Sequence, residues 1–273
     1  MMSSNNGFLQ SIPPVTKNII FINLLFWLAA VTLPKVSMNL IGVPVDLTKW
    51  LGLHLILAPD FKLYQFVSYM FMHDTSSFTH LFFNMFSVYM FGRAIESTWG
   101  PKRFLIFYMI TGIGAGVVQQ VFWLVENQSV IIALSQAVDS GSAQSLISVQ
   151  PLLSSYFSGL TDLSLLKESD LIYLNDLYLN MHVTVGASGA VFGILLAFAM
   201  LYPNTPLYLM FIPIPIKAKY FVVFYGLVEL FMGVARFSGD NVAHFAHLGG
   251  ILFGFILVKF WKKKDRDNGR YFY

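Results

Sequence analysis

Long apolar stretches separated by polar connections dominate the chain. The predicted helices are six apolar segments that are long enough, or nearly so, to cross a bilayer: residues 18–33, 78–98, 104–125, 183–202, 220–235 and 242–260. Because lipid offers no hydrogen-bond partners, a spanning backbone must pair its own groups, and the alternation typical of a membrane barrel is missing here. The pattern therefore predicts an all-α membrane protein with a bundle of six transmembrane helices.

Two connections are longer than ordinary loops. Residues 35–77 contain an apolar run at 50–57 that is too short to span, which favours an interfacial, partly submerged hairpin. Residues 127–182 are rich in Ser, Asp, Asn and Leu, and Pro151 interrupts their most apolar part at 146–160. We expect this second connection to be an insertion of short helices outside the membrane.

Composition supports the membrane class. Hydrophobic residues make up 56% of the 273 residues and charged residues only 11%, where ordinary soluble domains have about a quarter charged. The absence of cysteine excludes disulfides, thiolate metal sites and a cysteine nucleophile. A net charge of +3 gives no indication of a nucleic-acid partner.

Lysine and arginine are distributed unevenly between the two sides of the predicted bundle. With the N-terminus in the cytoplasm, 12 of the 17 basic residues are cytoplasmic: Lys17, Arg93, Lys102, Arg103, Lys217, Lys219, Lys259, Lys262, Lys263, Lys264, Arg266 and Arg270. This bias predicts that both termini are cytoplasmic. The predicted divisions are a cytoplasmic tail at 1–17, a membrane domain at 18–261 with an outer insertion at 127–182, and a basic cytoplasmic tail at 262–273. The short tails and the lack of a presequence favour a bacterial plasma membrane.

Candidate chemistry begins with a serine and a histidine on different spans. Ser188 lies in the sequence GASG at 186–189, and His247 lies near the start of the last span. Each is followed by a G-x-x-x-G pattern, at 189–193 and 250–254, which lets two membrane helices approach closely. We expect the hydroxyl of Ser188 to be a nucleophile and the imidazole of His247 its general base. The alternative for the serine motif alone is helix packing.

A second polar pair, His80 and Asn84, lies one turn apart near the outer end of the second span. Polar side chains in an apolar helix need partners, so these two are candidate oxyanion donors, together with the Ser188 backbone N–H. The alternative is a structural hydrogen bond between helices.

The remaining polar residues give weaker predictions. His244 and His247 form an H-x-x-H pair, but no carboxylate shares their helix face, so no metal site is predicted. For Glu229 a packing hydrogen bond is favoured over a proton relay, and Glu96 is expected to brace the inner end of the second span. No role is assigned to the other histidines, His54, His73 and His182.

Four motifs in order along the chain together resemble the rhomboid family of intramembrane serine proteases. They are H-x-x-x-N at 80–84, G-x-x-x-E-x-x-x-G at 92–100, GASG at 186–189 and A-H-x-x-G-x-x-x-G at 246–254. The resemblance implies a rhomboid-like bundle of six transmembrane helices with a catalytic dyad of Ser188 and His247 and no third acid. It also implies that His80 and Asn84 line an oxyanion hole, and that no metal or organic cofactor is needed.

The same resemblance implies the partners. They are the lipid bilayer and transmembrane protein substrates, which are cut near their outer end, with the fifth helix as the substrate gate and no nucleic acid. Water would reach Ser188 through a polar cavity capped by residues 237–241.

The chain departs from the family pattern at three residues and in one segment. Tyr64 and Gln65 stand where the first loop often carries Trp and Arg, and Phe192 replaces a frequent tyrosine one turn after the serine. The 127–182 insertion has no counterpart in compact bacterial members.

Two other functions stay open at this stage. One is a catalytically inactive rhomboid-like protein that binds client membrane helices. The other is a transporter that uses Glu229 and the histidines as a proton path, although the sequence lacks the inverted repeat expected of one.

Overall fold

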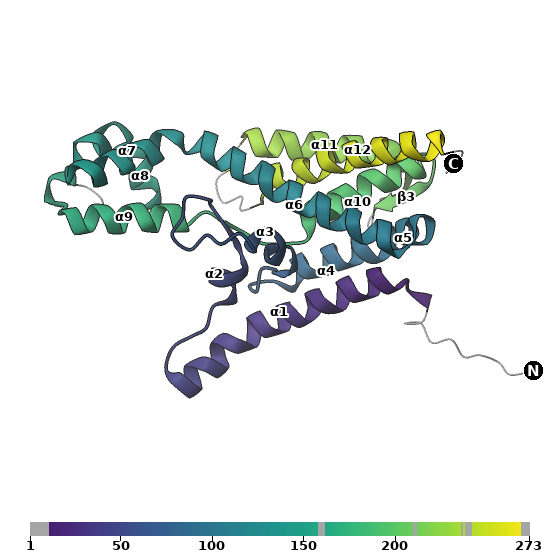
Figure 1. Ribbon diagram of the computed structural model, residues 1–273, viewed down its shortest axis with the longest axis horizontal. Helices are drawn as coiled ribbons and strands as arrows, with labels where there is room; N and C mark the ends of the chain where they lie inside the picture. Colours follow the sequence, from purple (N-terminus) through teal and green to yellow (C-terminus); the bar gives the residue numbers. More distant parts are fainter. Residues whose placement is uncertain (1–10, 158–161, 210–211, 236, 238–241, 269–273) are drawn as a thin grey trace, which may run out of the picture.

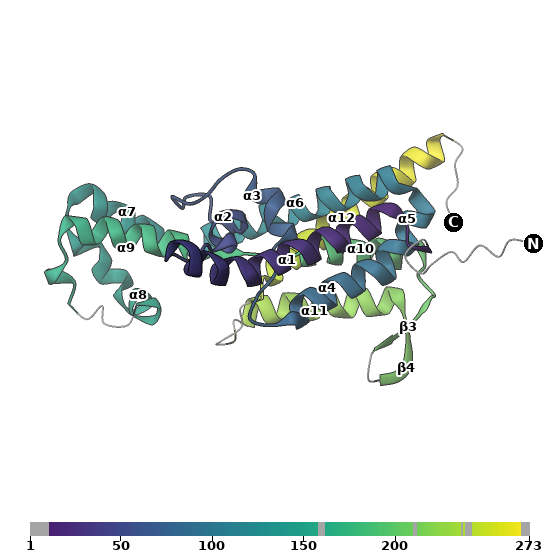
Figure 2. The same ribbon diagram turned by 90° about the horizontal axis from the view of Figure 1, so that it is seen from below.

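The computed structural model describes residues 11–157, 162–209, 212–235, 237 and 242–268. The helices of the bundle run side by side, and α1 begins at the end of the bundle where α12 finishes (Figures 1 and 2). The six predicted spans correspond to α1 (Pro14–Ile41), a second span built from α4 (Phe78–Ser87), the π-helical η3 (Val88–Gly92) and α5 (Arg93–Trp99), then α6 (Pro101–Glu126), α10 (Ser188–Leu201), α11 (Ala218–Ala235) and α12 (His244–Asp267). The predicted fold class, an all-α membrane protein, is confirmed.

The spans differ in length. Four helices in the described part of the chain, α1, α6, α11 and α12, are long and apolar enough to cross a membrane, whereas α10 is a shorter apolar helix of 14 residues. Large apolar side chains on the outer faces of α1 and α11 are exposed, as expected for surfaces that face lipid.

Several predicted boundaries were wrong. The first helix does not stop before Pro34 but continues to Ile41, where Gly42 adopts φ 72° and ends it. A proline removes only one backbone donor, which a membrane helix tolerates. The fourth helix begins at Ser188 instead of residue 183, because the preceding residues form β2 (Val183–Thr184). The last helix continues to Asp267, through most of the basic tail.

The first loop is folded against the bundle. It contains α2 (Leu47–Leu51), β1 (Leu53–His54), α3 (Gln65–Ser68) and the 3₁₀ helix η2 (Tyr69–Phe71). Strand β1 pairs antiparallel with β2, with Leu53 opposite Thr184. This pairing joins the loop directly to the segment that leads into Ser188.

Gln65 anchors this loop from within. Its side chain is fully buried, and its amide oxygen accepts from the backbone N–H groups of His54 and Lys62 at 3.3 and 3.2 Å. Its amide nitrogen donates to the carbonyls of Trp50 and Asp60 at 3.2 and 3.0 Å. Gln65 therefore ties together three parts of the loop, at the position where the family that the chain resembles often carries arginine.

The insertion is a small unit beyond the end of α6, and it consists of short helices, as predicted. Its elements are α7 (Gln128–Ser140), η4 (Ala143–Val149), α8 (Gln150–Tyr156), η5 (Leu163–Leu165) and α9 (Glu168–Asn180). They enclose their own apolar core, which includes Leu134, Leu146, Leu153 and Leu171. The Tyr178 hydroxyl donates to Asn127 Oδ1 at 2.7 Å and joins α9 to the end of α6.

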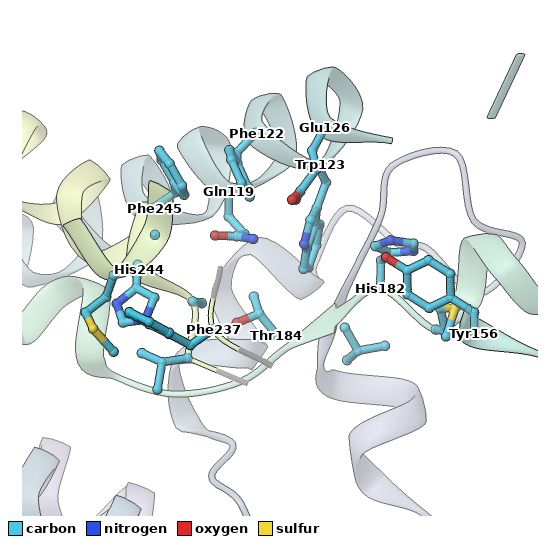
Figure 3. Close-up of a pocket in the computed structure, with 16 residues that line it drawn as sticks. Gln119, Phe122, Trp123, Glu126, Tyr156, His182, Thr184, Phe237, His244 and Phe245 are labelled. Atoms are coloured by element: carbon cyan, nitrogen blue, oxygen red, sulfur yellow. The ribbon is translucent and has the colours of Figure 1, made fainter. Parts of the chain in front are cut away.

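A cavity of about 440 Å³ separates the insertion from the bundle (Figure 3). Trp123 of α6, Tyr156 and His182 of the insertion, and His244 of α12 line it. At the other end of the bundle, the hairpin β3 (Pro206–Leu209) and β4 (Ile212–Lys217) connects α10 to α11. The sequence pattern does not predict this hairpin.

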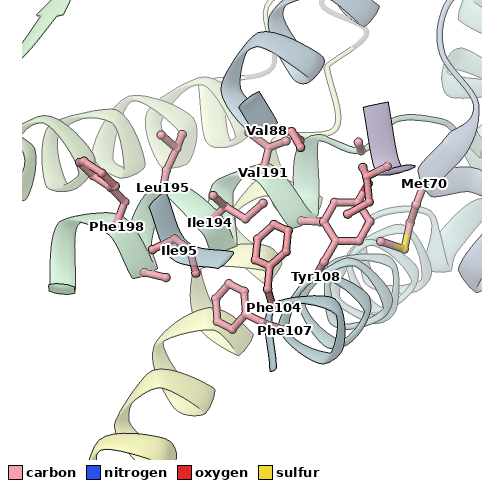
Figure 4. Close-up of a cluster of buried hydrophobic side chains, with 14 of the residues drawn as sticks. Met70, Val88, Ile95, Phe104, Phe107, Tyr108, Val191, Ile194, Leu195 and Phe198 are labelled. Carbon is pink, nitrogen blue, oxygen red and sulfur yellow. The ribbon is translucent and has the colours of Figure 1, made fainter. Parts of the chain in front are cut away.

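Large apolar side chains of the second span, α6 and α10 interdigitate in the main core, and Phe104, Tyr108, Ile95 and Ile194 are completely or almost completely buried there (Figure 4). On its other side, α10 packs against α12 with almost no side chains between them. A Cβ atom added to Gly250 would lie 1.8 Å from the Gly189 carbonyl oxygen. The predicted close approach of the two G-x-x-x-G patterns is therefore present, with backbone against backbone.

Candidate active site

Two side chains that the sequence singled out meet where α10 and α12 begin. Ser188 is the first residue of α10, and His247 is buried one turn into α12. The Oγ atom of Ser188 and the Nε2 atom of His247 are 2.8 Å apart, which is hydrogen-bond distance. The structure thus brings the candidate nucleophile and the candidate base together.

The imidazole of His247 rests on an aromatic ring. Phe192, one turn after Ser188 on α10, stacks on it with the ring centroids 4.3 Å apart and the planes 13° from parallel. This is the ring contact that the family resemblance implied, made here without a hydroxyl. The stacking limits rotation of the imidazole about its Cβ–Cγ bond.

Glu229 of α11 lies on the far side of His247 from the serine. Its Oε2 atom accepts hydrogen bonds from His247 Nδ1 at 2.8 Å and from His244 Nδ1 at 2.6 Å. A carboxylate can only accept, so each Nδ1 atom carries its proton, and His247 Nε2 keeps a lone pair directed at Ser188. The resemblance implied no third acid, and here the structure differs.

His80 presents a hydrogen-bond donor to the same site. The backbone N–H of Asp74 donates to His80 Nδ1 at 3.3 Å, so the neutral ring carries its proton on Nε2. A Cβ atom added to Gly186 would lie 3.0 Å from this Nε2 and 3.6 Å from Ser188 Oγ. The space beside Gly186, whose φ is +130°, is therefore bordered by the serine and by a ring N–H.

Asn84, the second predicted oxyanion donor, is buried on the same helix. Its amide nitrogen donates to the His80 carbonyl at 2.8 Å, one turn earlier. An amide nitrogen carries two protons, so this bond leaves one for another acceptor. Ser188 begins α10, which makes its backbone N–H one of the helix donors without an intrahelical partner.

A histidine without a predicted role, His73, lies beside His80. Their ring centroids are 5.0 Å apart, and the His73 side chain is almost fully buried. Burial, with a smaller contribution from His80, lowers the pKa of His73 to about 3. His73 is therefore neutral at physiological pH and can pack against a neutral His80.

The other two unassigned histidines are also outside the spans. Burial lowers the pKa of His54 in β1 and that of His182, whose Nδ1 is 2.9 Å from the Tyr178 carbonyl oxygen. Within the described part of the chain, neither makes a hydrogen bond to Ser188 or His247. His182 instead lines the cavity next to the insertion.

That cavity reaches the polar cluster through His244 (Figure 3). The side chains of Gln119 and Thr184 also face it, so its lining is partly polar. Residues 238–241 of the expected cap lie outside the described part of the chain, and Phe237 lines the cavity.

The cluster also contains a possible set of metal ligands. One ligand atom each from Glu229, His244 and His247 lie within 4.8 Å of one another. From sequence alone no metal site is predicted, because the helix that carries the two histidines offers no carboxylate on their face. The neighbouring helix α11 supplies it.

Comparison with protein families identifies the family of the chain. Residues 60–263, about three quarters of the chain, match the model of the Rhomboid domain. The chain belongs to the rhomboid family. The matched part of this rhomboid extends from the first loop into α12 and so contains every motif that carried the resemblance. Comparison with curated proteins gives no match.

The family assignment supports a membrane protein that is either an intramembrane protease or a related protein without that activity. Which of the two this rhomboid is depends on the residues of the site.

Proposed function

We propose that this rhomboid is an intramembrane serine endopeptidase that cleaves transmembrane segments of other proteins. The observation that carries the proposal is the 2.8 Å contact between Ser188 Oγ and His247 Nε2. Inactive relatives that only bind client helices have no need for this pairing, and both residues are present with the tautomer that catalysis requires.

The contacts support a complete sequence of proton transfers. Ser188 Oγ attacks the scissile carbonyl carbon while His247 Nε2 takes the hydroxyl proton, and Glu229 stabilises the imidazolium through Nδ1. His247 then gives the proton to the leaving amine, which leaves an acyl group on Ser188. A water molecule, deprotonated by His247, hydrolyses this ester and restores the serine.

The negative charge that develops on the carbonyl oxygen needs donors. We assign this role to His80 Nε2–H, the Asn84 amide and the Ser188 backbone N–H. The position of His80 Nε2 beside Gly186 and Ser188, the Asn84 amide one turn along the same helix, and Ser188 at the first position of α10 support the assignment. Loss of one oxyanion donor typically lowers kcat by about 10²–10³-fold.

The depth of the serine supports cleavage within the bilayer. Helix α10 has 14 residues, or about 21 Å of rise, which is shorter than the roughly 30 Å of a hydrocarbon core. With the other end of α10 at one membrane surface, where Lys262 Nζ donates to the Met200 carbonyl, Ser188 would lie below the opposite surface. From the bias of basic residues, we place this surface on the outer side, with both termini in the cytoplasm.

The test is cleavage of a helix-destabilised transmembrane reporter in proteoliposomes, together with fluorophosphonate labelling of the serine. Ser188→Ala and His247→Ala should each abolish cleavage, and Ser188→Ala should abolish labelling. Ser87→Ala, which removes a hydroxyl from the second span, is the matched control and should retain both. Cleavage that persists in both site variants refutes the proposal, and client binding without cleavage by the unmodified protein would favour the inactive alternative.

A further inference from the structure

We propose that Glu229, His244 and His247 bind a divalent transition metal ion of the zinc class, and that this ion inhibits the protease. The inhibition rests on the proposed function, whereas the binding site does not. None of the catalytic steps above requires a metal.

The donor set fits zinc. Two imidazole nitrogens and one carboxylate oxygen are a common zinc ligand set, and a fourth position can be filled by water. The two histidines lie one turn apart on α12, and α11 brings Glu229 Oε2 to 2.6 Å from His244 Nδ1 and 2.8 Å from His247 Nδ1.

Metal binding requires only a modest rearrangement of this cluster, because its three ligand atoms already lie within 4.8 Å of one another. Metal–ligand bonds of about 2.0–2.1 Å in a tetrahedron place neighbouring ligand atoms about 3.3 Å apart. Each hydrogen-bonded pair would therefore open by about 0.5–0.7 Å as the ion replaces the bridging protons. Small rotations of the Glu229 side chain and of the two imidazoles would supply such a shift.

The charge balance also favours a cation. The Glu229 carboxylate is 6% exposed and faces two rings that are 10–11% exposed, so the ion would meet a negative charge with little competing water. When the ion binds at Nδ1, each neutral imidazole moves its proton from Nδ1 to Nε2. No oxidant or other reactant is required.

That proton shift explains the inhibition. His247 Nε2 would become a donor to Ser188 Oγ across the present 2.8 Å contact, instead of a base that takes its proton. A metal-bound histidine usually donates its other ring N–H to a nearby acceptor, and Ser188 is in that position. The metal-bound enzyme would retain its serine but lack its general base.

The ion has a route to the site. His244 lines the cavity of about 440 Å³ between the insertion and the bundle (Figure 3). Gln119, Glu126 and Thr184 add polar atoms along this cavity.

The first experiment measures binding without catalysis. Full-length Ser188→Ala protein, without a histidine tag and stripped of metal, is titrated with Co²⁺ and then Zn²⁺, and the visible absorption of tetrahedral Co²⁺ is followed. We expect one ion per chain, displaced by Zn²⁺ and not by Mg²⁺, which prefers oxygen ligands. Adding Glu229→Gln or His244→Asn should weaken binding by about 100-fold or more.

The matched control is His182→Asn in the same background, because His182 lines the cavity but is not a proposed ligand. This control should bind the metal ion as tightly as the Ser188→Ala protein does. The proposed site is wrong if the control loses as much affinity as the ligand variants, or if the His244→Asn protein binds the ion unchanged.

The second experiment measures reporter cleavage in proteoliposomes with and without Zn²⁺. Zinc should inhibit cleavage by the unmodified protein, and a chelator should restore it. For the His244→Asn protein, the cleavage rate with Zn²⁺ should be nearly the same as the rate without it. Metal binding by a protein that never cleaves would refute the proposed function and leave the site standing. Cleavage without metal binding would refute this inference alone.

Discussion

The Glu229 carboxylate gives His247 a defined orientation and tautomer. Three contacts converge on that imidazole: Glu229 at Nδ1, Ser188 at Nε2 and Phe192 on its face. Together they place the lone pair of the base toward the hydroxyl before any substrate arrives. Such pre-arrangement avoids reorganisation at the moment of reaction.

Glu229→Gln should therefore lower kcat more than it changes KM. The amide can donate as well as accept, so it no longer imposes one tautomer on His247. Loss of the acid in a soluble serine triad costs up to about 10⁴-fold, and we expect about 10²-fold here because Phe192 still holds the ring. The measurement is reporter kinetics at several substrate densities, with Glu229→Asp as the conservative comparison. An unchanged kcat would show that the carboxylate is only structural.

Glu96 shows a similar role for a carboxylate in the fold. It accepts from the backbone N–H groups of Val15 and Thr16 at 2.9 and 2.7 Å, and from the Thr16 hydroxyl at 2.7 Å. Glu96 thus satisfies the free donors at the start of α1 from a helix 80 residues away in sequence. The sequence predicted a bracing role but not that the partner is the first helix.

At the scale of helices, the α10 and α12 contact determines whether the site exists. Gly193 and Gly254 continue the backbone contact one turn beyond Gly189 and Gly250, with the Cβ position of Gly254 3.1 Å from Gly193 Cα. Any side chain here would move the imidazole away from the hydroxyl.

Gly250→Ala should consequently destabilise the protein and abolish cleavage. The added methyl carbon would lie 1.8 Å from the Gly189 carbonyl oxygen. Because that oxygen belongs to the backbone, the clash can be relieved only if α10 and α12 move apart. We expect a loss of about 1–3 kcal/mol or more in stability, the range for overpacking, measured by thermal unfolding in detergent. Gly226→Ala on α11 is the matched control, since its Cβ would lie 3.5 Å from Ile251, an ordinary contact. Equal stability of the two variants would contradict the packing described here.

At the scale of the whole molecule, the buried loop histidines connect stability to pH. The folded-state pKa of His73 is about 3, below the value of roughly 6.5 expected in the unfolded chain. Between these two values the unfolded state binds a proton that the folded state does not. Stability is therefore greatest above about pH 6.5 and falls as the pH decreases through this window.

His73→Phe should reduce that acid sensitivity. At pH 5 the linkage for one such histidine amounts to about 2 kcal/mol, so the variant should lose less stability than the unmodified protein between about pH 7.5 and 5. Melting temperatures in detergent at the two pH values measure the difference. His54 and His182 contribute in the same direction, so some pH dependence should remain. Identical pH dependence in the two proteins would contradict a buried, neutral His73.

The sequence predicted those features that can be recognised from the residue pattern of each helix by itself. Apolar length gave the spans, and small residues gave the α10 and α12 contact that joins Ser188 to His247. It did not predict the contact of Glu229 with His247, because that depends on how α11 is rotated about its axis. Nor did it predict the β3–β4 hairpin, where Pro206, Pro213 and Pro215 disfavour an ordinary strand.

The short α10 sets a depth for the proposed reaction. Lys262 Nζ donates to the Met200 carbonyl at 2.9 Å and marks the far end of α10 as a polar boundary. Counting about 21 Å from there leaves roughly 9 Å of hydrocarbon above Ser188, or about six residues of a helical substrate at 1.5 Å each. The enzyme would then cleave at a fixed depth below the membrane surface. Moving the apolar edge of a substrate by two residues should move the cleavage site by two residues, whatever side chains flank that site.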